Sequence, residues 1–251
     1  MSSGHVGYAW LEAKRQWRNR EALVFRLVLP TAVFLILTAV GAGEDRVDAP
    51  GLSSLPSGAA RMVALAALGA LMSGLAAGPA LGEERASGWL RQLRVTPLRP
   101  SAAVTAKIVA AMTFALPSIA LVVGAAAITE GTTLSWAATV ELVGLMWLAT
   151  VPITALGTVI GLVFAAEAAQ GATTFAFLVL WLLGGIFTSP SNMPDVLANV
   201  AETLPSYGVV QVGWSAASGD AIPVSAVAVL AAWGAGGALL AGLAWRRIVT
   251  R

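Results

Sequence analysis

Hydrophobic residues come in six long runs separated by polar segments. Each run has roughly the 20 apolar residues that a helix needs to cross the hydrocarbon core of a bilayer, and few or none of its residues are charged. Strand-like alternation of polar and apolar residues is absent, which favours a helical bundle over a barrel. The pattern predicts an all-α integral membrane protein with six transmembrane helices, at about 24–43, 62–82, 102–128, 138–164, 171–188 and 222–245.

The polar lead before the first run predicts an interfacial helix at 5–22. Trp10, Ala13 and Trp17 fall on one side of such a helix, while Lys14 and Arg15 lie on other faces. Tryptophan favours the headgroup layer and arginine favours anionic lipid. We expect this helix to lie on the membrane surface; contact with a partner subunit through the same face is the alternative.

The segment 189–221, between runs five and six, predicts a cap on the outer side. Asn192-Met193-Pro194 is a helix start signal, and Pro205 closes the stripe of apolar residues that follows it. A second apolar stretch covers 207–217. Because both pieces are too short to span, we expect re-entrant or interfacial helices. Spans and connectors together use residues 1–251, which predicts a single transmembrane domain.

Composition supports a membrane protein, and the charge distribution predicts its orientation. The chain is 57% hydrophobic and only 11% charged, with a mean hydropathy of +0.80, which excludes an ordinary soluble domain. Basic residues favour the cytoplasmic side, so we expect both termini in the cytoplasm and the chain in a bacterial plasma membrane. Thirteen of the 15 basic residues fall on that side: Lys14, Arg15, Arg18, Arg20, Arg26, Arg85, Arg91, Arg94, Arg99, Lys107, Arg246, Arg247 and Arg251.

The sequence does not contain the residues that several kinds of catalytic site require. The chain has one histidine, His5, and no cysteine, which argues against a zinc site or a thiol nucleophile. Lys14 and Lys107 are the only lysines, and neither belongs to a Gly-Lys-Ser/Thr phosphate loop. We therefore expect a protein that is not an enzyme and holds no cofactor of its own.

The longest cluster of charge lies in segment 83–101, between runs two and three. Helical spacing puts Trp89, Leu90 and Leu93 on one side, and Pro97 disfavours continuation of the helix at the preceding residue. An apolar stripe on a short helix can dock in the groove of a partner protein. A helix lying flat on the lipid surface is the alternative.

These features resemble the permease subunits of type-2 ABC exporters, the family of daunorubicin-resistance-type drug exporters and polysaccharide exporters. The first motif consists of Glu84-Arg85, Gly88, Leu90, Leu93, Thr96-Pro97-Leu98 and Lys107-Ile108; the second consists of Gly184-Gly185, Pro190, Met193-Pro194 and Leu204-Pro205. Trp89 departs from the small polar residue expected after the glycine. The resemblance covers essentially the whole chain and implies the fold of these exporters, a dimer of permease subunits and two ATPase subunits on the cytoplasmic face.

The resemblance also implies roles for particular residues. Coupling to the ATPase falls to Glu83, Glu84, Arg85, Gly88, Trp89, Leu90, Leu93 and, in the turn 167–170, Glu167. The substrate path between spans two and five of the dimer has the candidates Met72, Ser73, Thr173, Thr174 and Phe177. Glu141 is a further candidate because it is ionisable inside a span; stabilisation of the helix N-terminus is its alternative role.

The resulting hypothesis is an exporter permease that moves a hydrophobic drug, antibiotic or lipid-like substrate outward. ATP and magnesium would bind the partner ATPase, and the other partners would be a second permease subunit and membrane lipids, not nucleic acid. An exporter of polysaccharide, glycolipid or peptide is the first alternative. A membrane anchor or channel subunit outside the ABC class is the second.

Overall fold

A computed structural model describes residues 3–40, 46–47, 52–88, 100–130, 134–186 and 193–250. Its helices are α1 (Ser3–Trp17), α2 (Arg20–Leu23), the π-helix η1 (Val24–Val28), α3 (Leu29–Ala39), α4 (Ser57–Leu75), α5 (Ala77–Ala86), α7 (Pro100–Thr129), α8 (Trp136–Ala149), α9 (Val151–Val163), α10 (Ala166–Leu183), α11 (Asp195–Glu202), α12 (Pro205–Ser218) and α13 (Val224–Thr250). The strands β1 (Arg46–Val47) and β2 (Leu55–Pro56) pair antiparallel. Apart from this short pair, the all-α prediction is confirmed.

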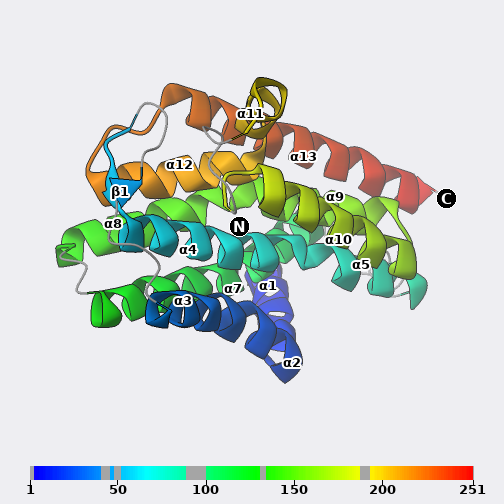
Figure 1. The fold of residues 1–251 in the computed structure, drawn as a ribbon. Coiled ribbons are helices and arrows are strands. Elements are labelled where there is room, and N and C mark those ends of the chain that lie inside the picture. The colour runs from blue at the N-terminus through cyan, green and yellow to red at the C-terminus, as the bar shows by residue number, and fades with distance from the viewer. Residues whose placement is uncertain are drawn as a thin grey trace.

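The long helices run side by side between two ends of the bundle (Figure 1). We call the end that carries the C-termini of α5 and α13 the basic end. The opposite end, where α4 begins and the strands lie, is called the distal end. The sequence predicts that the basic end is cytoplasmic.

Five stretches within the described residues are long and apolar enough to cross a membrane. They are Ser57–Ala86, Thr105–Thr129, Trp136–Val163, Ala166–Leu183 and Val224–Arg246. The first predicted span is shorter, since it consists of the five residues of η1 and the eleven of α3. At 1.5 Å per residue it covers about 24 Å, less than the roughly 30 Å of hydrocarbon. Six equivalent spans are therefore not established.

The fifth predicted span is displaced toward the basic end of the bundle. Its helix α10 begins at Ala166 and ends at Leu183, whereas the hydrophobic pattern predicted 171–188. Gly185, with φ of 76°, adopts the left-handed conformation that commonly follows the end of a helix. Glu167 lies in the first turn of α10, where a carboxylate interacts favourably with the helix dipole.

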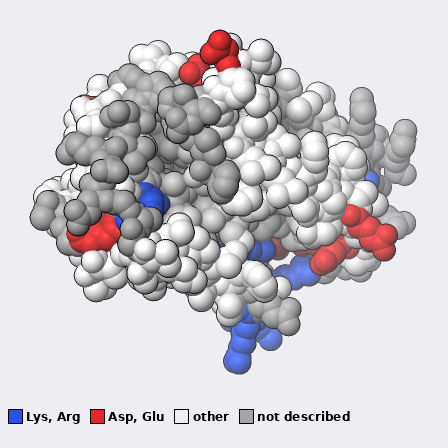
Figure 2. All heavy atoms as spheres, in the orientation of Figure 1, with Lys and Arg blue, Asp and Glu red and all other residues white. Residues whose placement is uncertain are grey.

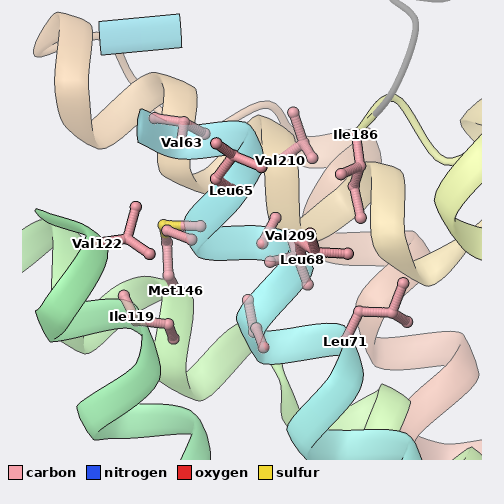
Figure 3. Packing of buried hydrophobic residues seen from close by; sticks show 14 of the residues in the cluster. Val63, Leu65, Leu68, Leu71, Ile119, Val122, Met146, Ile186, Val209 and Val210 are labelled. Carbon is pink, nitrogen blue, oxygen red and sulfur yellow. The ribbon is translucent and has the colours of Figure 1, made fainter. Parts of the chain in front are cut away.

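Helix α4 forms the centre of the bundle. In Ser57–Ala86, which joins α4 and α5, 78% of the most apolar window is buried, against 17% in α10 and 11% in α13. The exposed apolar faces of α10 and α13 are typical of surfaces covered by lipid or by another subunit. Figure 3 shows side chains from α4, α7, α8 and α12 meeting in the core, among them Leu65, Leu68, Ile119, Met146, Val209 and Val210.

Glycines bring α9 into backbone contact with the end of α4 and with α5. A Cβ atom placed on Gly157 would lie 3.0 Å from the Cα of Leu75, and one on Gly161 would lie 2.5 Å from the Cβ of Leu81. Gly78 faces Gly157 from the other helix, with 3.2 Å between its built Cβ and the carbonyl oxygen of Gly157. These small residues thus pack within one subunit, as such residues commonly do between membrane helices.

The predicted outer cap contains two helices within its described part. The eight-residue α11 is largely exposed, whereas the fourteen-residue α12 is buried from Pro205 to Ser215. Helix α12 packs against α4, α8 and α13, and at 14 residues it is too short to span. Burial within protein is the condition under which a non-spanning segment is tolerated at membrane depth.

Asp220 ties the strand region to the end of α12. Its Oδ2 accepts hydrogen bonds from the Ser53 backbone N–H at 2.7 Å and the Ser218 hydroxyl at 2.8 Å. The Ser53 hydroxyl donates to Oδ1 at 3.1 Å, and Trp214 Nε1 donates to the Ser53 carbonyl at 3.0 Å. Hydrogen bonds to the ionised carboxylate, first that from the Ser53 backbone, hold the pKa of Asp220 below its usual range.

The stability that the hydrogen-bonded Asp220 carboxylate contributes is expected to depend on pH. A carboxyl group whose pKa is lower in the folded state stabilises that state above its unfolded pKa, and the contribution is lost as pH falls through the folded pKa. Asp220→Asn should therefore lower the melting temperature near neutral pH, and the difference from wild type should shrink below about pH 4. Thermal unfolding across this pH range measures it. Asp195→Asn, on exposed α11, is the control; a difference for Asp220→Asn that does not change with pH would contradict the prediction.

Candidate functional site

A cluster of four charged side chains, three of them buried, joins three helices at the basic end. Lys107 of α7 lies 2.9 Å from Glu12 Oε1 of α1, and 2.8 and 2.6 Å from the two carboxylate oxygens of Glu84 of α5. Arg15 of α1 donates to Glu84 Oε1 at 3.1 Å. Lys107, Glu84 and Glu12 are only 3%, 4% and 7% exposed. Lys107 pairs with both buried acids, and Arg15, whose side chain is 63% exposed, adds a second base from the margin of the cluster. Such pairing is the condition for keeping the buried charges away from water.

Helix α1 docks on α7 beside this cluster. The Trp17 ring stacks on Phe114 with centroids 4.8 Å apart, and Trp17 Nε1 donates to Thr113 Oγ1 at 3.4 Å. Trp10 and Leu11 are 68% and 64% exposed. The helix thus combines a face held by α7 with exposed apolar side chains, as expected of a helix at a membrane surface.

Arg85 holds the end of α5 against the end of α9. Its Nη1 donates to the carbonyl oxygens of Leu162 at 2.5 Å and Phe164 at 3.2 Å. The last carbonyls of a helix lack partners within the helix and carry partial negative charge, so a guanidinium satisfies them well. The turn that follows leads to Glu167, which is exposed. Arg85 thereby brings the start of the coupling segment and the turn 167–170, the two regions predicted to contact the ATPase, to one end of the bundle.

The described part of the coupling segment ends at a glycine. Glu83 is exposed, whereas Glu84 is buried. The Ser87 hydroxyl donates to the Glu84 carbonyl at 3.1 Å, and Gly88 takes a φ of 76°, which turns the chain away from the helix. The three apolar coupling candidates lie outside the described residues: Trp89, Leu90 and Leu93.

A groove of about 390 Å³ opens beside the cluster, between the first span, α4–α5 and α10. It brings together four of the six predicted path residues: Met72, Thr173, Thr174 and Phe177. Ser73 and Glu141 do not line it. Ser73 is fully buried in α4, and Glu141 is exposed on α8, which begins at the distal end.

Sequence reasoning missed the contribution of the first span to this groove. Asn19, Phe25 and Arg26 line its other wall, and Glu83 and Gln170 complete its polar part. Arg26 could have been found, because it is an ionisable residue at the start of an apolar run. It was instead counted only among the residues that set the orientation.

The visible face of the molecule is largely uncharged (Figure 2). Charged side chains gather near its margins, and both signs occur together at two places, on the left and on the lower right. Charge is thus sparse over the face that a bilayer would cover.

Comparison with known proteins agrees with this architecture. Residues 8–237 match the family model described as "ABC-2 type transporter". The chain is also 27% identical over 230 residues to "Putative transport permease YvfS" of Bacillus subtilis (strain 168), an alignment that covers 88% of this chain and 89% of the relative. The match spans the buried charge cluster, the coupling segment and the groove alike. The chain belongs to the ABC-2 type transporter family and is a multi-pass membrane permease of that family.

Proposed function

We propose that this chain is the permease subunit of an exporter driven by ATPase subunits on separate chains. The observation that carries the proposal is the anchoring of the coupling segment, at residues 84 and 85, to three other helices of the bundle. The chain has no Gly-Lys-Ser/Thr loop to bind ATP itself. Because residues 84 and 85 are held by other helices of the bundle, a force that an ATPase applies to this segment from the cytoplasm would reach the spans directly.

The predicted coupling residues divide into two groups in this proposal. Buried Glu84 and the guanidinium of Arg85 hold the segment to the bundle and act as positioning residues. Exposed Glu83 and Glu167, with Gly88, Trp89, Leu90 and Leu93, supply the contact with the ATPase. A charge buried in its own subunit cannot also be the contact surface, whereas exposed residues can.

The groove supports the substrate path. In a dimer of permease subunits, two such grooves facing one another would line a central path, with Met72, Thr173, Thr174 and Phe177 contributed by each copy. Its mixture of aromatic, aliphatic and hydroxyl side chains suits a hydrophobic drug, an antibiotic or a lipid-like molecule. Polysaccharide, glycolipid and peptide are the alternative substrates. Ser73 and Glu141 are not part of this proposed path.

The proposed orientation of the chain in the membrane follows from the distribution of its basic residues. The basic end would face the cytoplasm of a bacterium, with both termini on that side of the plasma membrane, because translocation of arginine-rich segments is disfavoured. The ATPase subunits would then meet the coupling segment in the compartment that holds ATP. Buried α12 would be a re-entrant helix on the outer side.

Recovery of an ATPase with the tagged permease tests this proposal. Leu90→Ala with Leu93→Ala should reduce the ATPase recovered per permease about tenfold or more, because an apolar anchor removed from a docking helix weakens binding. Leu239→Ala with Leu243→Ala is the matched control, since both residues are exposed on apolar α13. Equal recovery with both double variants would contradict the coupling role.

A further inference from the structure

Arg26 lies in an apolar setting at the wall of the groove. It occupies the middle of η1, and α3 continues the same run with no charged residue. Its Cζ lies 5.5 Å from the Phe114 ring centroid, a cation–π contact, and its backbone carbonyl accepts a hydrogen bond from the Ser118 hydroxyl at 2.7 Å. Among the described residues, none of the ion pairs or side-chain hydrogen bonds involves its guanidinium.

The backbone at this position is also unusual. Residues Val24–Val28 form a π-helix in the middle of a helical run. Single π turns are rare and often occur at functional sites, because the extra residue redirects the neighbouring side chains. Arg26 and Phe25 both belong to this turn, and both line the groove.

The groove combines an apolar part with this cation. Phe25, Met72, Leu75 and Phe177 give it hydrophobic surface, whereas Asn19, Gln170 and Thr174 add neutral polar groups. Its charged lining residues are Arg26 and Glu83, which do not pair with one another. A ligand that fits must therefore match a hydrophobic surface and offer a partner to a guanidinium.

We propose that the groove binds amphiphiles that carry an anionic oxygen group, and that Arg26 binds that group. This inference rests on the proposed transport function and specifies its substrate class. The ring of Phe114 takes one face of the guanidinium, while the N–H donors along its edge suit two oxygens of a carboxylate or phosphate. The volume of about 390 Å³ is that of a small-molecule site.

Direct binding to the purified full-length permease tests the proposal. The protein in micelles of dodecyl maltoside, which carries no anionic group, is titrated with radiolabelled oleoyl lysophosphatidate, and binding to empty micelles is subtracted. Unlabelled competitors are monoolein, which has the same chain without the anion, and inorganic phosphate, which has the anion without the chain. We expect monoolein to compete about tenfold more weakly than lysophosphatidate, and phosphate to compete negligibly. Equal competition by monoolein, or competition by phosphate alone at the same concentration, would overturn the proposal.

Variants assign the effect to Arg26. Arg26→Gln should weaken lysophosphatidate binding about tenfold and leave monoolein binding unchanged, while Arg26→Lys should retain part of the preference. Arg18→Gln is the matched control, since Arg18 is exposed near the same end but does not line the groove. Unchanged binding by Arg26→Gln would refute the assignment; if that variant does not fold, Arg26→Lys and the wild-type competition still decide.

Failure of this inference can be separated from failure of the proposed function. If Arg26→Gln still binds the partner ATPase and supports ATP-dependent transport, but the groove shows no preference for anions, only the substrate class is wrong. If no ATPase binds the wild-type permease, the transport proposal itself fails.

Discussion

Lys107→Met should destabilise the folded permease by roughly 3–5 kcal/mol, because it leaves Glu12 and Glu84 buried without their shared cation. Removing one partner of a buried ionic cluster costs far more than breaking a surface pair. The melting temperature of the purified protein in detergent should fall by about 10 °C. Binding of the ATPase should fall with it, since the end of α5 would lose its connection to α1 and α7.

The only other lysine supplies the control for this prediction. Lys14 is exposed on α1, so Lys14→Met should change the melting temperature by less than 1–2 °C. Adding Glu12→Gln and Glu84→Gln to Lys107→Met removes the stranded charges and should recover part of the lost stability. If Lys107→Met and Lys14→Met melt at the same temperature, the cluster has no anchoring role.

Gly161→Leu should prevent correct packing of α9 against α5. Even the Cβ of the new side chain would lie 2.5 Å from the Leu81 Cβ and against the Gly78 carbonyl oxygen. Backbone atoms cannot yield as a flexible side chain can, so the two helices must separate. Gly161→Ala should cost about 1–3 kcal/mol, the range for overpacking, and leucine should cost more.

The yield of monodisperse protein and its melting temperature measure this effect. Gly144, on α8, has open space where a Cβ would lie, so Gly144→Leu is the matched control and should express like wild type. The same yield and melting temperature for both leucine variants would contradict the close contact between α5 and α9.

The hydrophobic pattern predicted most of the spans because a helix that crosses lipid needs a continuous run of apolar residues, which the local sequence shows directly. Five predicted spans correspond to helices long enough to cross a membrane. The shorter first span, with its π-helix, was not predicted, because its apolar run continues to residue 43, beyond the end of α3 at Ala39. The end of α10 was predicted too late, because an apolar run does not show where Gly185 ends the helix.

The arrangement of charges could not be read from the pattern. Glu84 meets Lys107, which is 23 residues away, and Arg15, which is 69 residues away. The resemblance placed Glu84 among the residues that couple to the ATPase, and a local pattern does not show that its side chain is buried against other helices. The groove was predicted in part, since Met72 and Phe177 lie on spans expected to meet substrate. The wall of the groove that the first span contributes was missed, because Arg26 was considered only as one of the basic residues that predict the orientation of the chain.

ATP-dependent movement of a fluorescent lipid-like amphiphile across proteoliposomes tests the central claim most directly. Vesicles hold the permease, its co-purified ATPase, or both. We predict ATP hydrolysis wherever the ATPase is present and transport only where both chains are present, with transport lost in the Leu90→Ala, Leu93→Ala variant. ATP hydrolysis by the permease alone, or ATP-dependent transport that does not need the ATPase, would contradict the account.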